Sequence, residues 1–111
     1  MRASDALAGD ILRGIPEMYW RSIDLRDGVS WRGFEPNPPH KVLTAHRWMA
    51  WYSEGGFRPG GDDVFVYVGH RWVYKTVDGK RKKRIVREVL FRGEPCWIDP
   101  AVWKYLEKVE D

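Results

Sequence analysis

The sequence predicts an α+β fold: a small twisted antiparallel sheet of three to five strands, packed with two or three short helices. A run of β-branched and aromatic residues over positions 64–92, interrupted by Asp78-Gly79, indicates a hairpin or meander. Three shorter stretches place apolar residues at helical spacing. The length of 111 residues fits one compact domain over residues 1–111, because domains of about 100 to 150 residues are the commonest.

The first predicted helix covers residues 5–13. Ser4 is a suitable N-cap, and Leu7 and Ile11 fall on one face of a helix. Gly14 and Pro16 follow as stop signals. Such a short helix needs to dock on the rest of the domain.

Residues 15–40 give weaker signals. Residues 18–25 are compatible with either a strand or a helical turn, and Asp27-Gly28 indicates a turn. Residues 29–34 show the alternation of a short strand. Residues 35–39 contain three prolines and are predicted to be irregular, because proline removes a hydrogen-bond donor and restricts the residue before it.

A second helix is predicted from about residue 41 to residue 53. Val42, Ala45, Met49 and Tyr52 form its apolar stripe, and two glycines after residue 54 end it. Residues 55–63 are rich in glycine and form a connection to the hairpin region.

The hairpin signal is the strongest in the chain. Asp-Gly between two extended runs favours a two-residue turn, because both positions tolerate a positive φ. With that turn, Val77 pairs with Lys80 and Lys75 with Lys82. Alternation then places two sets of residues on opposite faces. One set is Trp72, Tyr74, Lys83 and Ile85, and the other is Arg71, Lys75, Lys82 and Arg84.

The third predicted helix lies at the C-terminus. Asp99 is its expected N-cap and Pro100 its first residue, where a missing N–H costs nothing. Val102, Leu106 and Val109 would line its buried face.

Composition indicates a globular protein with an unusual tryptophan content. Hydrophobic residues make up 43% of the chain, charged residues 32%, and seven residues are Trp. Most of these rings are expected in the core. Cys96 is the only cysteine, which excludes an internal disulfide and favours a reducing compartment. It is expected to be a small buried hydrophobe. With no signal peptide and no apolar run long enough for a membrane span, a cytoplasmic location without membrane contact is expected.

The positive charge is concentrated in the hairpin. The net charge of the chain is +3, but residues 71–92 contain nine basic and two acidic residues, a net charge of +7. The rest of the chain carries ten basic and fourteen acidic residues. A cluster of this kind favours an anionic partner.

The preferred function is therefore non-enzymatic binding of nucleic acid or another polyanion, as an accessory or regulatory protein. Lysine and arginine neutralise phosphates, and aromatic rings can stack on bases. The predicted nucleic-acid-binding residues are Arg71, Lys75, Lys80, Arg81, Lys82, Lys83, Arg84 and Arg87. The stacking candidates are His70, Trp72 and Tyr74.

Other interpretations remain open from the sequence. The chain is alternatively a protein-interaction module, a structural subunit or an inhibitor of a nucleic-acid-handling complex, which meets an acidic protein surface or forms a homo-oligomer through exposed Trp and Arg anchors. The lysines also fit a solvated edge hairpin that resists aggregation. A metal-dependent nuclease using Asp62, Asp63 and Glu88 lacks the usual lysine, since Leu90 occupies that position. The histidine and cysteine spacings match no metal site, and no catalytic residue, metal or cofactor is predicted.

Overall fold

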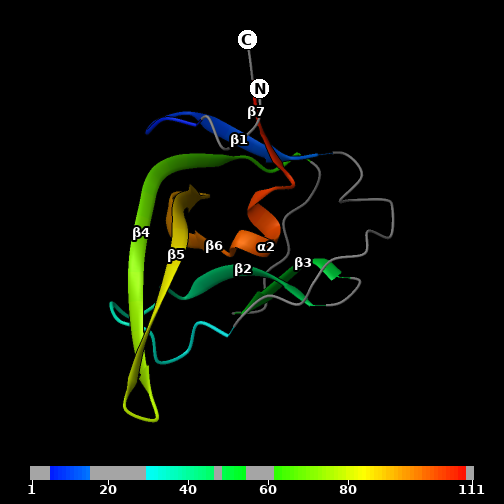
Figure 1. Ribbon diagram of the computed structural model, residues 1–111. Coiled ribbons are helices and arrows are strands. Elements are labelled where there is room, and N and C mark those ends of the chain that lie inside the picture. The colour runs from blue at the N-terminus through cyan, green and yellow to red at the C-terminus, as the bar shows by residue number, and fades with distance from the viewer. Residues whose placement is uncertain (1–5, 16–29, 47–48, 55–61, 110–111) are drawn as a thin grey trace.

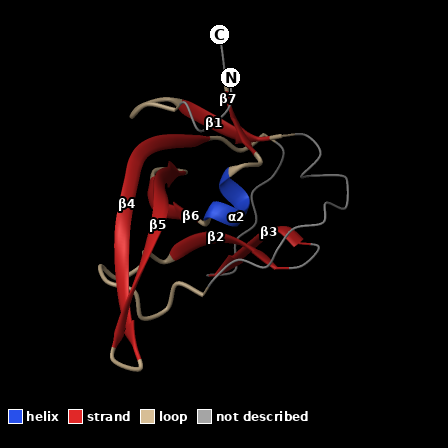
Figure 2. Cartoon of the chain, in the orientation of Figure 1, coloured by secondary structure: helices blue, strands red, loops and turns tan. Residues whose placement is uncertain are grey.

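Seven strands form one mixed sheet, and one short helix packs against it in the described part of the chain (Figures 1 and 2). The computed structural model describes residues 6–15, 30–46, 49–54 and 62–109. The elements in chain order are β1 (Ile11–Gly14), β2 (Lys41–His46), β3 (Met49–Glu54), β4 (Phe65–Val77), β5 (Lys80–Phe91), β6 (Glu94–Ile98), α2 (Pro100–Trp103) and β7 (Leu106–Lys108). The strand order across the sheet is β3-β2-β6-β5-β4-β1-β7.

The long β4–β5 hairpin is the central pair of this sheet. All neighbouring strands are antiparallel except β2 and β6, which pair in parallel. A β-bulge between Tyr67 and Gly69 shifts the register of β4 against β5. Bulges bend the strand that carries them, and Figure 1 shows β4 curving over at the end that pairs with β1.

The sheet carries a hydrophobic cluster on each face. Along β2, Val42 and Leu43 are both buried but belong to different clusters, and Val86 and Val89 of β5 divide in the same way. Since side chains alternate between the faces of a strand, the clusters lie on opposite sides. The larger contains Leu12, Leu43, Phe65, Tyr67, Val89, Phe91, Cys96, Ile98, Val102, Trp103 and Leu106. The smaller contains Trp31, Phe34, Val42, Val73, Val86 and Trp97.

Asp99 connects the segment over the smaller cluster to the rest of the fold. Its carboxylate accepts hydrogen bonds from Trp31 Nε1 at 2.8 Å, Thr44 Oγ1 at 3.2 Å and Ala101 N at 2.7 Å. The side chain is buried, so these donors replace the water that a carboxylate would otherwise bind. One carboxylate therefore fixes the loop around Trp31, strand β2 and the start of α2.

The predicted α+β class is wrong, because the described chain is mostly β, with a mixed sheet and one short helix. The predicted helix at residues 5–13 is replaced by a turn and then β1, in which Leu12 is buried and Ile11 is exposed. β1 pairs with both β4 and β7. These tertiary contacts outweigh a weak local helix preference.

The predicted helix at residues 41–53 is likewise wrong and is replaced by β2 and β3. Val42, Leu43 and Thr44 are buried in succession. A strand that is covered on both faces shows no alternation of apolar and polar residues. Its apolar residues can therefore match a helical spacing by chance, and they did so here.

The C-terminal prediction is partly confirmed. Asp99 is the N-cap of α2, accepting a hydrogen bond from Ala101 N, and Pro100 is at its start. The helix ends at Trp103, however, and Leu106 begins β7 instead of extending the helical face. Residues 32–33 form a turn, closed by a hydrogen bond from Phe34 N to the carbonyl oxygen of Trp31, where a strand over 29–34 was predicted. The predictions for residues 18–25, for Asp27-Gly28 and for most of the connection at 55–63 lie outside the described residues.

Candidate nucleic-acid interface

The hairpin turn has the geometry that its sequence predicts. Asp78 has a φ of 51° and Gly79 a φ of 75°, both in the left-handed region that a two-residue type I′ turn requires. Val77 pairs with Lys80, Lys75 with Lys82 and Val73 with Arg84. The predicted register is therefore confirmed, and with it the division of the side chains between two faces.

The end of the hairpin extends beyond the other strands. β6 pairs with β5 only over Arg87–Phe91, and β1 pairs with β4 only at Phe65 and Val66. Farther out, Glu35 forms an isolated bridge with Tyr74. We call residues 75–84 the basic arm; Figure 1 shows it as the yellow-green loop that projects away from the sheet.

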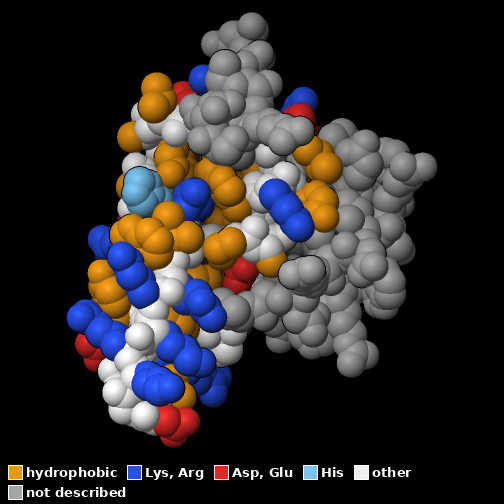
Figure 3. All heavy atoms as spheres, in the orientation of Figure 1, with side chains coloured by type: hydrophobic (Ala, Val, Ile, Leu, Met, Phe, Trp, Pro, Cys, Tyr) orange, Lys and Arg blue, Asp and Glu red, His pale blue; other side chains and the backbone are white. Residues whose placement is uncertain are grey.

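The basic arm is exposed and strongly positive. Every residue from Asp78 to Arg84 is exposed to solvent. The arm contains six basic residues and one acidic residue, and Figure 3 shows the basic side chains gathered over this end of the molecule. Among the residues that the structure describes, no carboxylate lies within ion-pair distance of Lys80, Lys82 or Arg84.

One face of the arm surrounds a small hollow with cations. Lys75, Lys82 and Arg84 line this hollow of about 140 Å³ together with Ser30, Phe34 and Val77. Lys75 Nζ donates to the carbonyl oxygen of Arg32 at 3.0 Å and lies 5.7 Å from the centre of the Phe34 ring. Lys75 is thus held in place, while Lys82 opposite it repels it across the strand pair.

The other face combines cations with aromatic rings. The guanidinium of Arg81 lies 4.0 Å from the centre of the Tyr74 ring, and Lys83 Nζ lies 4.1 Å from that of Trp72. Trp72 is 45% exposed. The cation–π contacts orient both positive groups on this face. His70 is also exposed and precedes Trp72 by two positions in β4.

We call residues 65–71 and 86–91, the paired ends of β4 and β5 nearest the core, the root of the hairpin. Two predicted binding residues lie there and differ from those of the arm. Arg71 Nε is 3.1 Å from Glu88 Oε1, so its charge is neutralised by the protein itself. Arg87 lies 5.3 Å from the centre of the Trp103 ring. From the sequence alone, Arg71 and Arg87 cannot be distinguished from the cations of the arm. The register of the hairpin distinguishes Arg71, because it places Glu88 on the same face.

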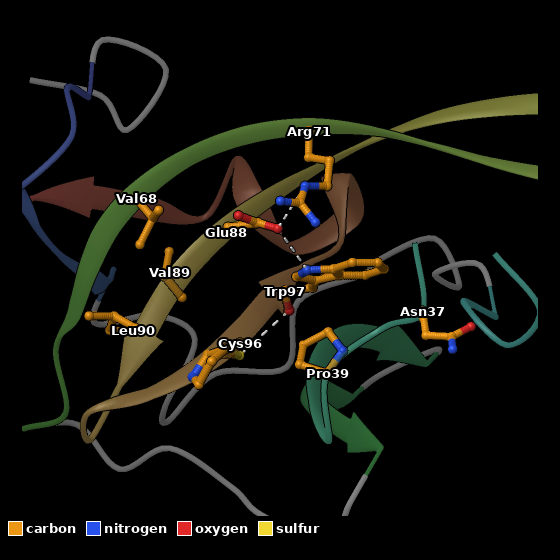
Figure 4. Close-up of a pocket in the computed structure, with 10 residues that line it drawn as sticks. Asn37, Pro39, Val68, Arg71, Glu88, Val89, Leu90, Cys96 and Trp97 are labelled. Carbon is orange, nitrogen blue, oxygen red and sulfur yellow. Dashed lines mark hydrogen bonds and ion pairs between the residues drawn. The ribbon is translucent and has the colours of Figure 1, made fainter. Parts of the chain in front are cut away.

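A pocket that the sequence does not predict lies beside the hairpin root (Figure 4). It has a volume of about 300 Å³, and Val68, Leu90 and Pro95 contribute to its apolar walls. Glu88 accepts a hydrogen bond from Trp97 Nε1 at 3.3 Å and pairs with Arg71 at its edge. The Glu88 carboxylate is therefore already engaged by two partners within the protein.

The candidate nuclease residues have other contacts. Asp63 pairs with Arg92 at 3.1 Å, and Glu88 pairs with Arg71. Within residues 6–15, 30–46, 49–54 and 62–109, no group of three or more His, Cys, Asp or Glu side chains could hold a metal ion. Cys96 is buried, and burial raises the pKa of its thiol to about 12. It therefore remains a neutral thiol at physiological pH.

The tryptophans divide between core and surface. Trp31, Trp97 and Trp103 are buried, and Trp72 is exposed. Trp20, Trp48 and Trp51 lie outside the described residues and side chains. No described helix is long and apolar enough to cross a membrane. Comparison with protein-family models, curated proteins and solved structures finds no match to this chain.

Proposed function

We propose that this protein binds nucleic acid through the phosphate backbone, using the basic arm. The observation that carries the proposal is the combination of projection, exposure and charge at residues 78–84. An exposed cation contributes little to the stability of the folded protein. It contributes to binding a nucleic acid, because it neutralises a phosphate and releases condensed counterions. Lys80, Lys82 and Arg84 are such cations, and no carboxylate among the described residues lies within ion-pair distance of them.

The hollow beside the arm supports the same function. Three cations border a space of about 140 Å³, which is large enough for a phosphate group. Lys75 is already oriented by its hydrogen bond to the carbonyl oxygen of Arg32. The entropic cost of ordering this side chain on binding is therefore smaller than it would be for a fully mobile lysine.

Salt dependence gives the size of the expected effect. Each phosphate contact contributes a slope of about 0.9 to the dependence of log K on log salt for duplex DNA. If five arm cations each contact a phosphate, affinity falls roughly 500-fold between about 50 and 200 mM salt. We expect fluorescence anisotropy with labelled DNA and RNA probes to show this decrease.

A matched pair of variants tests the location of the site. Lys82→Glu and Lys104→Glu change the net charge equally, and both residues are exposed. Lys104 follows α2 and lies outside the hairpin. We expect Lys82→Glu to weaken binding at least tenfold and Lys104→Glu to have little effect. Equal effects would show that only net charge matters and would remove the arm from the proposal.

The alternative function is a protein contact anchored on Trp72. Its large exposed ring beside Lys83 has the composition of an interface anchor. Such binding should persist at moderate salt and be lost in Trp72→Ala, whereas binding to phosphates should survive that substitution largely unchanged. Light scattering at several salt concentrations would also detect self-association.

A further inference from the structure

We propose that the basic arm enters the major groove of double-stranded DNA and contacts phosphates on both walls. This inference rests on the proposed function and identifies the form of nucleic acid. Its starting point is that cations project from both faces of the arm. Lys80, Lys82 and Arg84 share one face, and Arg81 and Lys83 share the opposite one.

A flat or one-sided partner would leave two or three of these five cations without a phosphate. A strand lying against one face would neutralise that face only, because the two sets point in opposite directions. A groove presents phosphates on two sides of an inserted element. The arrangement of charge therefore favours a groove over a surface or a single extended strand.

The dimensions of the arm agree with insertion. The B-DNA major groove is about 12 Å wide and accepts a two-stranded ribbon. Beyond the Glu35–Tyr74 bridge, β4 and the turn continue for four residues, from Lys75 to Asp78. At about 3.3 Å per residue this gives a reach of about 13 Å, more than the groove depth of about 8.5 Å.

The contacts of the aromatic rings argue against a single-stranded ligand. Proteins that bind single-stranded nucleic acid stack its bases on the exposed faces of aromatic rings. Tyr74 and Trp72 each carry a cation at 4.0 to 4.1 Å from the ring centre, so a base stacking there would displace it. Double-stranded RNA also fits poorly, because its major groove is deep and narrow.

The experiment compares three probes of one sequence: a DNA duplex of about 20 base pairs, its single strand, and the corresponding RNA duplex. We expect the DNA duplex to bind at least tenfold more tightly than either of the others. Equal or tighter binding of the single strand or the RNA duplex would overturn the groove model and leave the proposed function standing. Absence of binding to all three probes would overturn the proposed function itself.

Two matched double variants test whether both faces take part. Lys82→Gln with Arg84→Gln neutralises one face, and Arg81→Gln with Lys83→Gln neutralises the other. Each pair should reduce the salt slope for the DNA duplex by about 1.8, since each phosphate contact contributes about 0.9. A reduction in only one pair would show one-sided binding and overturn the model. Circular dichroism and thermal unfolding of each variant verify that the fold is retained.

A chemical readout identifies the groove. Guanine N7 faces the major groove, so bound protein should protect it from methylation at the centre of the site. Unchanged methylation at protein concentrations that saturate the duplex would place the arm elsewhere and contradict the inference.

Discussion

The root and the outer end of the β4–β5 hairpin are both antiparallel strand pairs but have opposite surroundings. At the root, Phe65 pairs with Phe91 and Tyr67 with Val89, and all four side chains are buried. At the outer end, Lys75 pairs with Lys82 and Thr76 with Arg81, next to solvent. The root therefore holds the fold together, whereas packing does not explain the composition of the arm.

The folded core beside the hairpin should be sensitive to loss of Asp99, which holds the loop around Trp31. Asp99→Ala removes the α2 cap, worth about 1 kcal/mol, and leaves Trp31 Nε1 and Thr44 Oγ1 without this acceptor, at about 1 to 3 kcal/mol for each buried donor. We expect a loss of about 3 kcal/mol or more in the free energy of unfolding, measured with urea. The arm control Lys82→Ala should change it by less than about 0.5 kcal/mol. Similar losses in both variants would contradict the division.

A substitution in the turn should destabilise the protein through backbone strain alone. Gly79→Ala places a side chain at a φ of 75°, although nothing lies within 4 Å of the added Cβ. A left-handed conformation costs an ordinary residue about 1 to 2 kcal/mol. The matched control is Gly69→Ala, which also meets nothing within 4 Å and has no positive φ. Thermal unfolding should show destabilisation in the first variant only; equal behaviour would exclude a backbone origin.

The arm should become more stable when one of its cations is reversed. Lys82→Glu converts a like-charge cross-strand pair with Lys75 into an attractive one. Such pairs contribute about 0.2 to 1 kcal/mol. We expect urea unfolding to show a small gain while affinity for nucleic acid falls. A loss of stability would mean that the lysines of the arm serve the fold, which would blur the contrast between arm and root.

The smallest expected effect is the pH dependence of the stability that Asp10 contributes. The backbone N–H of Leu7, with Lys108 as a second cause, holds the pKa of Asp10 below its usual value, and Lys41 does the same for Glu94. A carboxyl group with a lowered pKa in the folded state stabilises the protein above its unfolded pKa. That stabilisation is lost as the pH falls through the folded value. Asp10→Asn should therefore slightly lower the midpoint of urea unfolding at neutral pH. It should have no such effect at a pH below the pKa of Asp10 in both the folded and the unfolded state. An equal decrease at both would contradict this cause.

Local signals predicted the hairpin well. Asp78-Gly79 specifies a turn through the conformations of two residues, and the turn then sets the pairing of every position out to Arg71 and Val86. The cap at Asp99 is a similarly local feature. Local signals do not show which cations are exposed and which are paired with a carboxylate. Those pairings, Arg71 with Glu88 and Arg92 with Asp63, depend on the register and on contacts between residues distant in the sequence.

Helix predictions failed where tertiary contacts decide the structure. Leu12 lies in a four-residue strand between two partners, and Val42 and Leu43 pack on different faces of the same sheet. A spacing of apolar residues does not show whether one face or two will be covered. Arg92-Gly93 was also missed as a turn, although Arg92 has a φ of 52° and Gly93 one of 79°. A glycine between two apolar runs was the available signal.

The position of Asp99 after both Trp31 and the hairpin in the sequence has a consequence for synthesis on the ribosome. The charged loop between β4 and β5 emerges well before the carboxylate that anchors Trp31, and Trp31 itself emerges earlier still. The Trp31 indole, which belongs to the smaller hydrophobic cluster, therefore lacks its final acceptor until the 68 residues from Arg32 to Asp99 have been added. Loss of Asp99 and the residues after it would remove the acceptor that anchors Trp31 as well as strand β7.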